Sequence, residues 1–392
     1  MLIGFDAKRA FHNSRGLGNY SRHTIRILSK YYPDNHYFLF NPKTKRKLSL
    51  HMAENMSEVN PQQLFWRTFP YLWRSLGMRQ KISKRKLDIY HGLNQELPYG
   101  IQYTKAKTVV TLHDAIFVRY PKLYPPIYRL VFIAKNKHAC KVADKIICIS
   151  EQTKQDAIKF FGADENKIEV VYQGCDAIFN EEVSEKAKQT LQLKYNLPET
   201  YLLNVGTIEK RKNTKLIVEA LHRTKNETPL LIVGKPTKYE KELRTLIAKY
   251  GMQEQVTILN NIETSDFPAL YAMAKMFIFP SIFEGFGIPI LEALTVGTPV
   301  ITSAGSCFEE TAGPFSLYFD SSDADQLGAL INQVLSNDEL SARMIAEGKK
   351  HALNFSDENI AANLMGVYKS LGFVPISNYS NNTLRGDFET TK

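Results

Sequence analysis

Two glutamates enclose a short segment rich in glycine and proline in the second half of the chain. Between Glu284 and Glu292 lie Gly285, Gly287 and Pro289, and the apolar run before them is typical of a buried strand. Glycine lets a backbone approach a ligand because it has no Cβ atom, and proline is favoured in the first turn of a helix. The free N–H groups of a helix N-terminus attract anions. A strand, a glycine turn and a helix in this order therefore predict a phosphate site.

The two carboxylates need a different partner, because a phosphate would repel them. Hydroxyl groups donate hydrogen bonds to carboxylates and are suitable partners. At helical rise, the eight residues from Glu284 to Glu292 span roughly 12 Å, about the distance from a hexose across a diphosphate to a ribose. The spacing therefore indicates a sugar nucleotide as the ligand.

Further polar residues follow predicted strands, at the strand ends where ligands gather in an open parallel sheet. Arg211 and Lys212 lie between a strand and a helix, and we expect them to clamp a leaving diphosphate. His113 and Asp114 end another apolar strand, and the glycine turn at 15–20 follows the first strand of the chain. Together these segments predict an active site made by several strand ends.

The segment from Glu284 to Ala293, Glu-Gly-Phe-Gly-Ile-Pro-Ile-Leu-Glu-Ala, resembles the signature of the retaining glycosyltransferases of family 4. The resemblance covers roughly residues 1–371 and is strongest over 200–313. It implies an α/β protein of the GT-B fold, in which two doubly wound Rossmann-like domains face each other across a deep cleft. It also implies a nucleotide-sugar donor bound mainly by the C-terminal domain and an acceptor bound mainly by the N-terminal one.

The resemblance assigns roles to individual residues. Glu284 is expected to bind hydroxyls of the donor sugar, Glu292 those of the ribose, and His113 a further sugar hydroxyl. The predicted catalytic residues are Glu284, His113, Lys212 and Arg211. The predicted donor-binding residues are Gly16, Gly18, Thr207, Gly285, Phe286, Gly287, Ile288 and Glu292, and the residues predicted on the acceptor side are Asp114, Tyr20 and Ser150.

The chain departs from the family pattern at Thr207. In the family, an arginine five positions before the lysine that matches Lys212 contacts the phosphates, and this chain has a threonine there. Either Arg211 supplies the missing charge or Thr207 donates a hydrogen bond to a phosphate oxygen. No metal ion or other cofactor is expected, because these cations and helix N–H groups can hold the leaving diphosphate.

The length of 392 residues is too great for one ordinary core, and strands alternate with helices in a doubly wound pattern. We predict an N-terminal acceptor-binding domain over residues 1–180, a linker over 181–200 and a nucleotide-sugar-binding domain over 201–355. A helix over 356–372 is expected to cross back to the first domain, and the polar tail 373–392 is expected to be disordered.

The composition, 44% hydrophobic and 23% charged, is that of a globular protein in water. No apolar run is long enough to cross a bilayer and the first residues do not resemble a signal peptide, so we expect a cytoplasmic location. The net charge of +10 favours anionic partners such as phosphate-rich donors or lipid surfaces. A nucleic-acid partner is not expected, because the sequence contains no recognised motif for one.

The segment 62–90 mixes aromatic and basic side chains. Its aromatic residues near the start are Phe65, Trp66, Phe69, Tyr71 and Trp73. Such a segment could lie on an anionic membrane, with rings at the headgroup level and cations on lipid phosphates. The rings could equally pack inward on the sheet. Both interpretations stay open, and the first makes the protein peripheral on the inner face of the cytoplasmic membrane.

The predicted function is transfer of a hexose from a nucleotide-diphosphate sugar to a hydroxyl of a glycan or lipid-linked glycan, with retention at the anomeric carbon. The resemblance favours mannose, with GDP-mannose or a UDP-sugar as donor, in bacterial surface polysaccharide or lipopolysaccharide synthesis. Retention without an evident nucleophile favours substitution on one face, in which the departing phosphate accepts the acceptor proton. A double displacement with Glu284 as nucleophile is the rival mechanism.

Two functions of other classes compete with this prediction. A nucleotide-sugar epimerase of GT-B fold would interconvert donors without an acceptor. A non-catalytic basic protein would bind membranes or nucleic acid through its positive charge alone.

Overall fold

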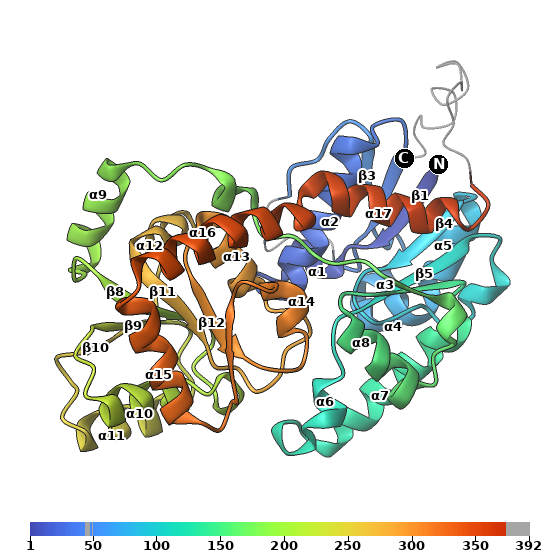
Figure 1. The fold of residues 1–392 in the computed structure, drawn as a ribbon. Coiled ribbons are helices and arrows are strands. Elements are labelled where there is room, and N and C mark those ends of the chain that lie inside the picture. The colour runs from blue at the N-terminus through green and yellow to red at the C-terminus, as the bar shows by residue number, and fades with distance from the viewer. Residues whose placement is uncertain (44–47, 49, 374–392) are drawn as a thin grey trace.

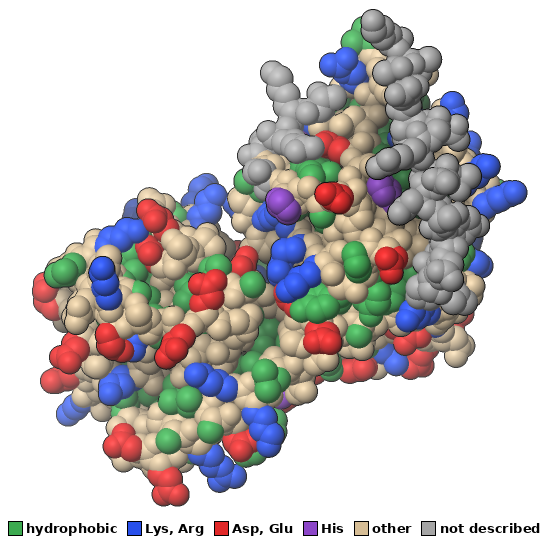
Figure 2. Space-filling view, turned by 90° about the horizontal axis from the view of Figure 1, so that it is seen from above, with side chains coloured by type: hydrophobic (Ala, Val, Ile, Leu, Met, Phe, Trp, Pro, Cys, Tyr) green, Lys and Arg blue, Asp and Glu red, His purple; other side chains and the backbone are tan. Residues whose placement is uncertain are grey.

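The computed structural model describes residues 1–43, 48 and 50–373. It has two domains, each built on a parallel sheet between helices (Figure 1). From above, the domains form two lobes that meet at a narrower waist (Figure 2). The predicted α/β class with two Rossmann-like domains is confirmed.

The first sheet consists of short apolar strands, as expected where helices cover both faces. In the part of the chain that the structure describes, it has seven parallel strands in the order β3-β2-β1-β4-β5-β6-β7. The strands are β1 (Leu2–Asp6), β2 (His36–Phe40), β3 (Met56–Val59), β4 (Ile89–Gly92), β5 (Lys107–Leu112), β6 (Lys145–Cys148) and β7 (Ile168–Val170). In β1, Phe5 pairs with Leu39 on one side and His91 on the other.

The second sheet repeats this design with six parallel strands among the described residues, in the order β10-β9-β8-β11-β12-β13. The strands are β8 (Tyr201–Val205), β9 (Leu230–Val233), β10 (Val256–Leu259), β11 (Ala274–Phe279), β12 (Val300–Ser303) and β13 (Leu317–Phe319). Because β8 and β11 are neighbours, the loops that follow them lie side by side at the carboxyl edge of the sheet.

The helices alternate with the strands. Those before the chain crosses to the second domain are α1 (Lys8–His12), α2 (Gly16–Tyr31), α3 (Leu64–Thr68), α4 (Pro70–Leu72), α5 (Met78–Lys84), α6 (Ile116–Arg119), α7 (Pro126–Val142) and α8 (Glu151–Asp156). Those after it are α9 (Glu185–Tyr195), α10 (Lys215–Thr224), α11 (Glu240–Lys249), α12 (Phe267–Met273), α13 (Ile288–Val296), α14 (Phe308–Ala312), α15 (Ala324–Leu335), α16 (Asp338–Ala352) and α17 (Asp357–Lys369).

The last helix lies on the first domain, where residues 356–372 were predicted to return (Figure 1). Ile360 and Leu364 of α17 are buried in the same apolar cluster as Leu28 of α2. His23 Nε2 on α2 lies 2.6 Å from Asp357 Oδ1 at the start of α17. The helix therefore joins the two domains on the side of the molecule where the chain crosses between them.

Residues 181–200, predicted as a linker, contain α9. Ser184 caps this helix by accepting from Ala187 N, and Leu191 and Leu197 are buried in the core of the second domain. The polar composition of α9 hid these apolar anchors. The segment is therefore part of the second domain, whereas the predicted disordered tail lies outside the described residues apart from Phe373.

The segment 62–90 divides its aromatic side chains between core and surface. Trp73, in a π-helical turn at Trp73–Gly77, is only 1% exposed, whereas Phe65, Phe69 and Tyr71 are 47% exposed or more. Inward packing is therefore confirmed for Trp73, whereas a membrane position of the exposed rings stays a prediction. None of the helices in the described part of the chain is long and apolar enough to span a bilayer.

Replacing Trp73 should therefore be far more damaging than replacing Phe65. Trp73→Ala is expected to lower the free energy of unfolding by about 3–5 kcal/mol, because it leaves a cavity in the core. Phe65→Ala, which removes a half-exposed ring, is expected to lower it by about 1 kcal/mol or less. Urea denaturation measures both, and equal losses would contradict this division of the segment.

Candidate active site

The centre of the site is a buried carboxylate that two cations share. The turn after β11 brings Glu284 against the loop after β8, so that its Oε1 lies 2.6 Å from Arg211 Nη1 and 2.7 Å from Lys212 Nζ. Ser281 Oγ donates a hydrogen bond to the same oxygen at 2.5 Å. The structure thus brings together Glu284, Arg211 and Lys212, which were predicted as catalytic residues.

The charges in this cluster support one another. Burial acts to raise the pKa of Glu284, but Lys212 and Arg211 outweigh it and lower the pKa below its ordinary value. Burial acts to lower the pKa of Arg211, but Glu284 and Glu209 raise it overall. Arg211 also donates to the Phe283 carbonyl at 2.6 Å. Glu284 and Arg211 therefore stay charged at neutral pH.

The turn after Glu284 also touches the first domain. A Cβ atom on Gly285 would lie 2.0 Å from the carbonyl oxygen of His113, so only glycine fits there. The Gly285 carbonyl accepts a hydrogen bond from Ser150 Oγ at 2.7 Å. The missing side chain of Gly285 therefore serves the close approach of the two domains, whereas the sequence indicated closeness to a ligand.

Ser150, predicted on the acceptor side, is fully buried. Besides bonding Gly285, its hydroxyl accepts from Thr153 N and so caps α8. In this structure Ser150 therefore stabilises the contact between the two domains.

His113 lies at the end of β5 with a defined proton position. Its Nε2 bonds the Leu93 carbonyl at 2.8 Å, and because a carbonyl only accepts, Nε2 carries the proton and Nδ1 is left as an acceptor. Burial lowers the pKa of His113 to about 4, so the ring is neutral at pH 7. The edge of the ring meets Tyr20 with centroids 4.6 Å apart. A neutral acceptor of this kind can bind a sugar hydroxyl, the role predicted for His113.

Asp114 follows this histidine in the chain, and the charge of Arg211 in the second domain affects its pKa. Its Oδ1 accepts from Ile116 N at 3.0 Å. Burial raises the pKa of Asp114, while the charge of Arg211 opposes the rise. Asp114 therefore lies close to the Glu284 cluster, across the boundary between the domains.

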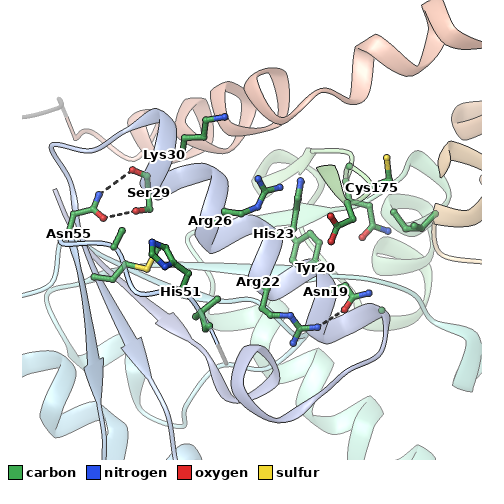
Figure 3. A pocket seen from close by; sticks show the side chains of 18 of the residues that line it. Asn19, Tyr20, Arg22, His23, Arg26, Ser29, Lys30, His51, Asn55 and Cys175 are labelled. Carbon is green, nitrogen blue, oxygen red and sulfur yellow. Dashed lines mark hydrogen bonds between the residues drawn. The ribbon is translucent and has the colours of Figure 1, made fainter. Parts of the chain in front are cut away.

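Glu292 belongs to a second group of residues, around a cavity of about 770 Å³ (Figure 3). Glu292 Oε2 accepts from the hydroxyl of Tyr271 at 2.8 Å, and Gly16, Tyr20 and Ile288 line the same cavity. A cavity of this volume is large enough for a ligand the size of a nucleoside. Of the predicted donor-binding residues, Gly16, Ile288 and Glu292 therefore line this cavity, together with Tyr20, which was predicted on the acceptor side.

Helix α2 gives the cavity a positive wall. Arg22, His23 and Arg26 project from it (Figure 3), and Arg22 Nη2 bonds Asn19 while His23 and Arg26 both pair with Asp357. Positive charge on this wall favours an anionic ligand.

Each of the other predicted glycines is explained by its own surroundings. Nothing lies within 4 Å of a Cβ built on Gly16, but one on Gly18 would lie 1.7 Å from the Asn13 carbonyl oxygen. Gly16 is therefore open to a ligand and Gly18 is needed for the packing of its own loop. Gly287 has a φ of +103° at the start of α13, a conformation that favours glycine.

Two further predicted residues complete the set. Phe286 is buried between the domains, with its ring centroid 5.9 Å from that of Tyr172. Thr207 is exposed on the loop after β8. Its predicted bond to a phosphate stays a prediction.

Nothing in the sequence pattern singled out Glu310 as part of the domain contact. Its carboxylate accepts from Glu151 N at 2.7 Å and from Gln152 N at 3.2 Å, the first backbone groups of α8. A carboxylate at a helix N-terminus is a familiar capping arrangement, but here the partners are 159 residues apart. Phe283, 4.9 Å from the Arg119 guanidinium, adds a cation–π contact to the same boundary.

Comparisons with known proteins assign the chain to a family. Residues 183–351 match the family Glycosyl transferases group 1, and residues 14–178 match Glycosyltransferase Family 4. O-antigen chain mannosyltransferase B of Escherichia coli is 31% identical over 72% of this chain and 74% of its own length. The chain belongs to the group 1 glycosyltransferases. The family predicted from the Glu284–Ala293 segment is confirmed.

The chain is similar to a second mannosyltransferase in sequence and to a solved structure in fold. The O-antigen chain mannosyltransferase RfbU of Salmonella typhimurium is 26% identical over 69% of this glycosyltransferase and 70% of its own length. The crystal structure of Anabaena Alr3699/HepE in complex with UDP-glucose covers 94% of this chain and 99% of that one, with a TM-score of 0.69 and 17% identity. At that identity the structure supports the fold alone.

The Gly285 contact can be tested by adding one methyl group to this glycosyltransferase. Gly285→Ala is expected to reduce turnover at least about tenfold, because the new Cβ forces the domains apart. Gly366→Ala is the control, since a Cβ there meets nothing within 4 Å and alanine favours the helix by about 0.5–1 kcal/mol. Turnover and melting temperature are measured for both, and identical behaviour would refute the proposed reason for glycine at 285.

The state of Glu292 predicts a dependence of stability on pH. Burial raises its pKa from 4.5 to about 7 in the folded protein. A raised carboxyl pKa stabilises the fold below about pH 4.5, and this contribution is lost as the pH rises through 7. Between pH 4.5 and pH 8, the free energy of unfolding of the wild type should therefore fall by up to about 3 kcal/mol more than that of Glu292→Gln. Denaturation at several pH values measures this difference, and parallel curves would contradict the assignment.

Proposed function

We propose that this glycosyltransferase transfers mannose from GDP-mannose to a hydroxyl of a bacterial surface polysaccharide, with retention at the anomeric carbon. The observation that carries the proposal is the cluster of Glu284 with Arg211 and Lys212 at the domain boundary. Mannose is favoured because two relatives are named O-antigen chain mannosyltransferases. A UDP-sugar is the other donor to test, since a structural neighbour holds UDP-glucose.

In the proposed reaction the donor diphosphate replaces Glu284 as the anionic partner of Arg211 and Lys212. Arg211 and Lys212 then neutralise the charge that develops as the bond between the anomeric carbon and the phosphate oxygen breaks. Glu284, released from them, accepts hydrogen bonds from sugar hydroxyls, and His113 accepts another through Nδ1. No metal ion or other cofactor is part of this proposal, because the two cations supply the positive charge.

Substitution on one face accounts for retention in this site. The acceptor oxygen bonds to the anomeric carbon on the face that the phosphate leaves, and the acceptor proton passes to the departing phosphate oxygen. A double displacement would need Glu284 as nucleophile. In this proposal Glu284 instead accepts hydrogen bonds from sugar hydroxyls once the two cations have moved to the diphosphate, which favours the first mechanism.

The acceptor side of the proposal is a glycan or lipid-linked glycan bound by the first domain. The exposed Phe65, Phe69 and Tyr71, on a segment rich in basic residues, support a peripheral position on the inner face of the cytoplasmic membrane. No observation favours an epimerase or a non-catalytic binding protein, and both relatives compared above are named as transferases.

The two carboxylates should fail in different ways when replaced. Glu284→Gln is expected to reduce turnover of GDP-mannose at least about a hundredfold, because the neutral amide replaces one of the carboxylate oxygens that accept hydrogen bonds from sugar hydroxyls with a donor. Glu292→Gln is expected mainly to weaken donor binding, by about tenfold. Release of GDP is measured in EDTA with bacterial membranes as the acceptor source, and donor binding by thermal shift with GDP-mannose, UDP-glucose and UDP-N-acetylglucosamine.

Activity should persist in EDTA, and GDP-mannose should give the largest thermal shift. Unchanged turnover and binding in both variants would overturn the assignment of the site. Capture of a glycosyl group on Glu284 would instead overturn substitution on one face.

A further inference from the structure

A charged corner of the first domain lies outside the residues discussed so far. Arg74, from the π-helical turn, is buried and lies 2.5 Å from both Asp6 Oδ2 and Glu96 Oε2. Lys135 of α7 reaches the same Glu96 oxygen at 3.1 Å. The end of β1, the turn after α4 and the middle of α7 therefore meet at one point.

Two more cations adjoin this point without a carboxylate of their own. Among the residues that the structure describes, Lys8 and Arg9 make no ion pair, and the Lys8 amino group lies 4.5 Å above the ring of Tyr71. Burial and the nearby charge of Arg74 lower the pKa of Lys8 to about 8. The positive charge of Arg9 acts in the same direction on the pKa of His113. Positive charge thus exceeds negative charge in a corner that borders the proposed sugar site.

Exposed apolar side chains flank the corner on two sides. Tyr71 lies under Lys8, and Val131 and Tyr128 precede Lys135 by one and two turns on the same face of α7. The exposed apolar residues of the two flanks include Phe69, Tyr71, Leu72, Ile127 and Val131. Surface of this kind is unusual in a protein without an apolar partner.

Aromatic rings cover the space between the corner and the second domain. Tyr128 stacks on Phe132 with centroids 4.1 Å apart and on Tyr124 at 5.8 Å. The charge of Asp114 raises the pKa of both tyrosines, after burial, so the stack lies near the wall of the candidate active site. Rings in such a position can hold sugar units between the corner and the reacting centre.

We propose that Lys8 and Arg9 bind a phosphate or diphosphate group of the acceptor, and that the flanking apolar side chains bind a lipid attached to that group. An anion would replace the missing partners of both cations, and a lipid would cover the apolar flanks. The inference rests on the proposed function and names the chemistry of its acceptor: a glycan joined through phosphate to a lipid. Lys8 and Arg9 are binding residues in this proposal and take no part in the chemical step.

Geranyl diphosphate is a suitable probe, and its binding to the full chain is measured by titration calorimetry. The protein is expected to bind it at least about tenfold more tightly than inorganic pyrophosphate or geraniol. Arg9→Gln and Lys8→Gln should each weaken this binding about tenfold, because each removes a charged hydrogen-bond donor. Leu72→Ser should reduce the preference over pyrophosphate.

Matched controls separate the corner from general effects of charge and surface. Lys137→Gln removes an exposed cation two positions from Lys135, on another face of α7, and should change nothing. Leu193→Ser replaces a residue of α9 that is 85% exposed and should also change nothing. The thermal shift with GDP-mannose should be the same in Arg9→Gln as in the wild type.

Several outcomes would overturn the proposal. Loss of geranyl diphosphate binding in Lys212→Ala but not in Arg9→Gln would assign the anion to the donor site. Equal affinity for pyrophosphate and geranyl diphosphate would show that the apolar flanks do not bind a lipid. An effect of Arg9→Gln on binding to phosphatidylglycerol vesicles alone would make the anion a membrane headgroup. Failure of GDP-mannose to bind would count against the donor proposal and leave this titration unaffected.

Discussion

Glu284 is buried as an anion, and this state is stable only because Arg211 and Lys212 share one of its oxygens. An unpaired carboxylate in the same place would be strongly unfavourable, so the loops after β8 and β11 must stay together. The order of the second sheet makes this possible. β8 separates β9 and β10 from β11, β12 and β13, so the cluster lies where the direction of strand addition reverses. Open α/β sheets bind ligands at such points.

The first sheet has the same feature on the other side of the boundary. β1 lies between β2, which leads to β3, and β4, which leads to β5, and the residues after β1 begin the turn into α1 and α2. The Gly285 turn makes direct contact with this domain through the His113 carbonyl and Ser150. Because the same turn carries Glu284, any motion that opens the domains also moves the carboxylate relative to His113. The contact therefore couples the geometry of the site to domain closure.

The sequence was most informative where one local segment carries both structure and chemistry. The strand, glycine turn and helix around Glu284 were recognisable because all their signals lie within a few residues, and the Arg211-Lys212 pair follows a strand in the same way. The reason why residue 285 must be glycine could not be recognised from the sequence, because the carbonyl oxygen that excludes a Cβ there belongs to His113, far away in the chain. The contact of Glu310 with α8 could not be predicted for the same reason, because an acidic residue on a short helix does not indicate a second helix 159 residues away. Within 62–90, periodicity could not separate buried Trp73 from exposed Phe65, because the helix is interrupted at Phe69 between them.

The distribution of positive charge gives the net charge of +10 a physical meaning. A transferase that joins a diphosphate donor to an acceptor carrying phosphate must hold two like-charged molecules close to each other. Arg211 and Lys212 lie on one side of the boundary and Lys8 and Arg9 on the other, so each anion would meet cations of its own. His113, between them, is neutral because burial lowers its pKa to about 4. A charged imidazole there would compete for either anion, whereas a neutral one leaves both substrates to their own cations and keeps an acceptor atom for the sugar between them.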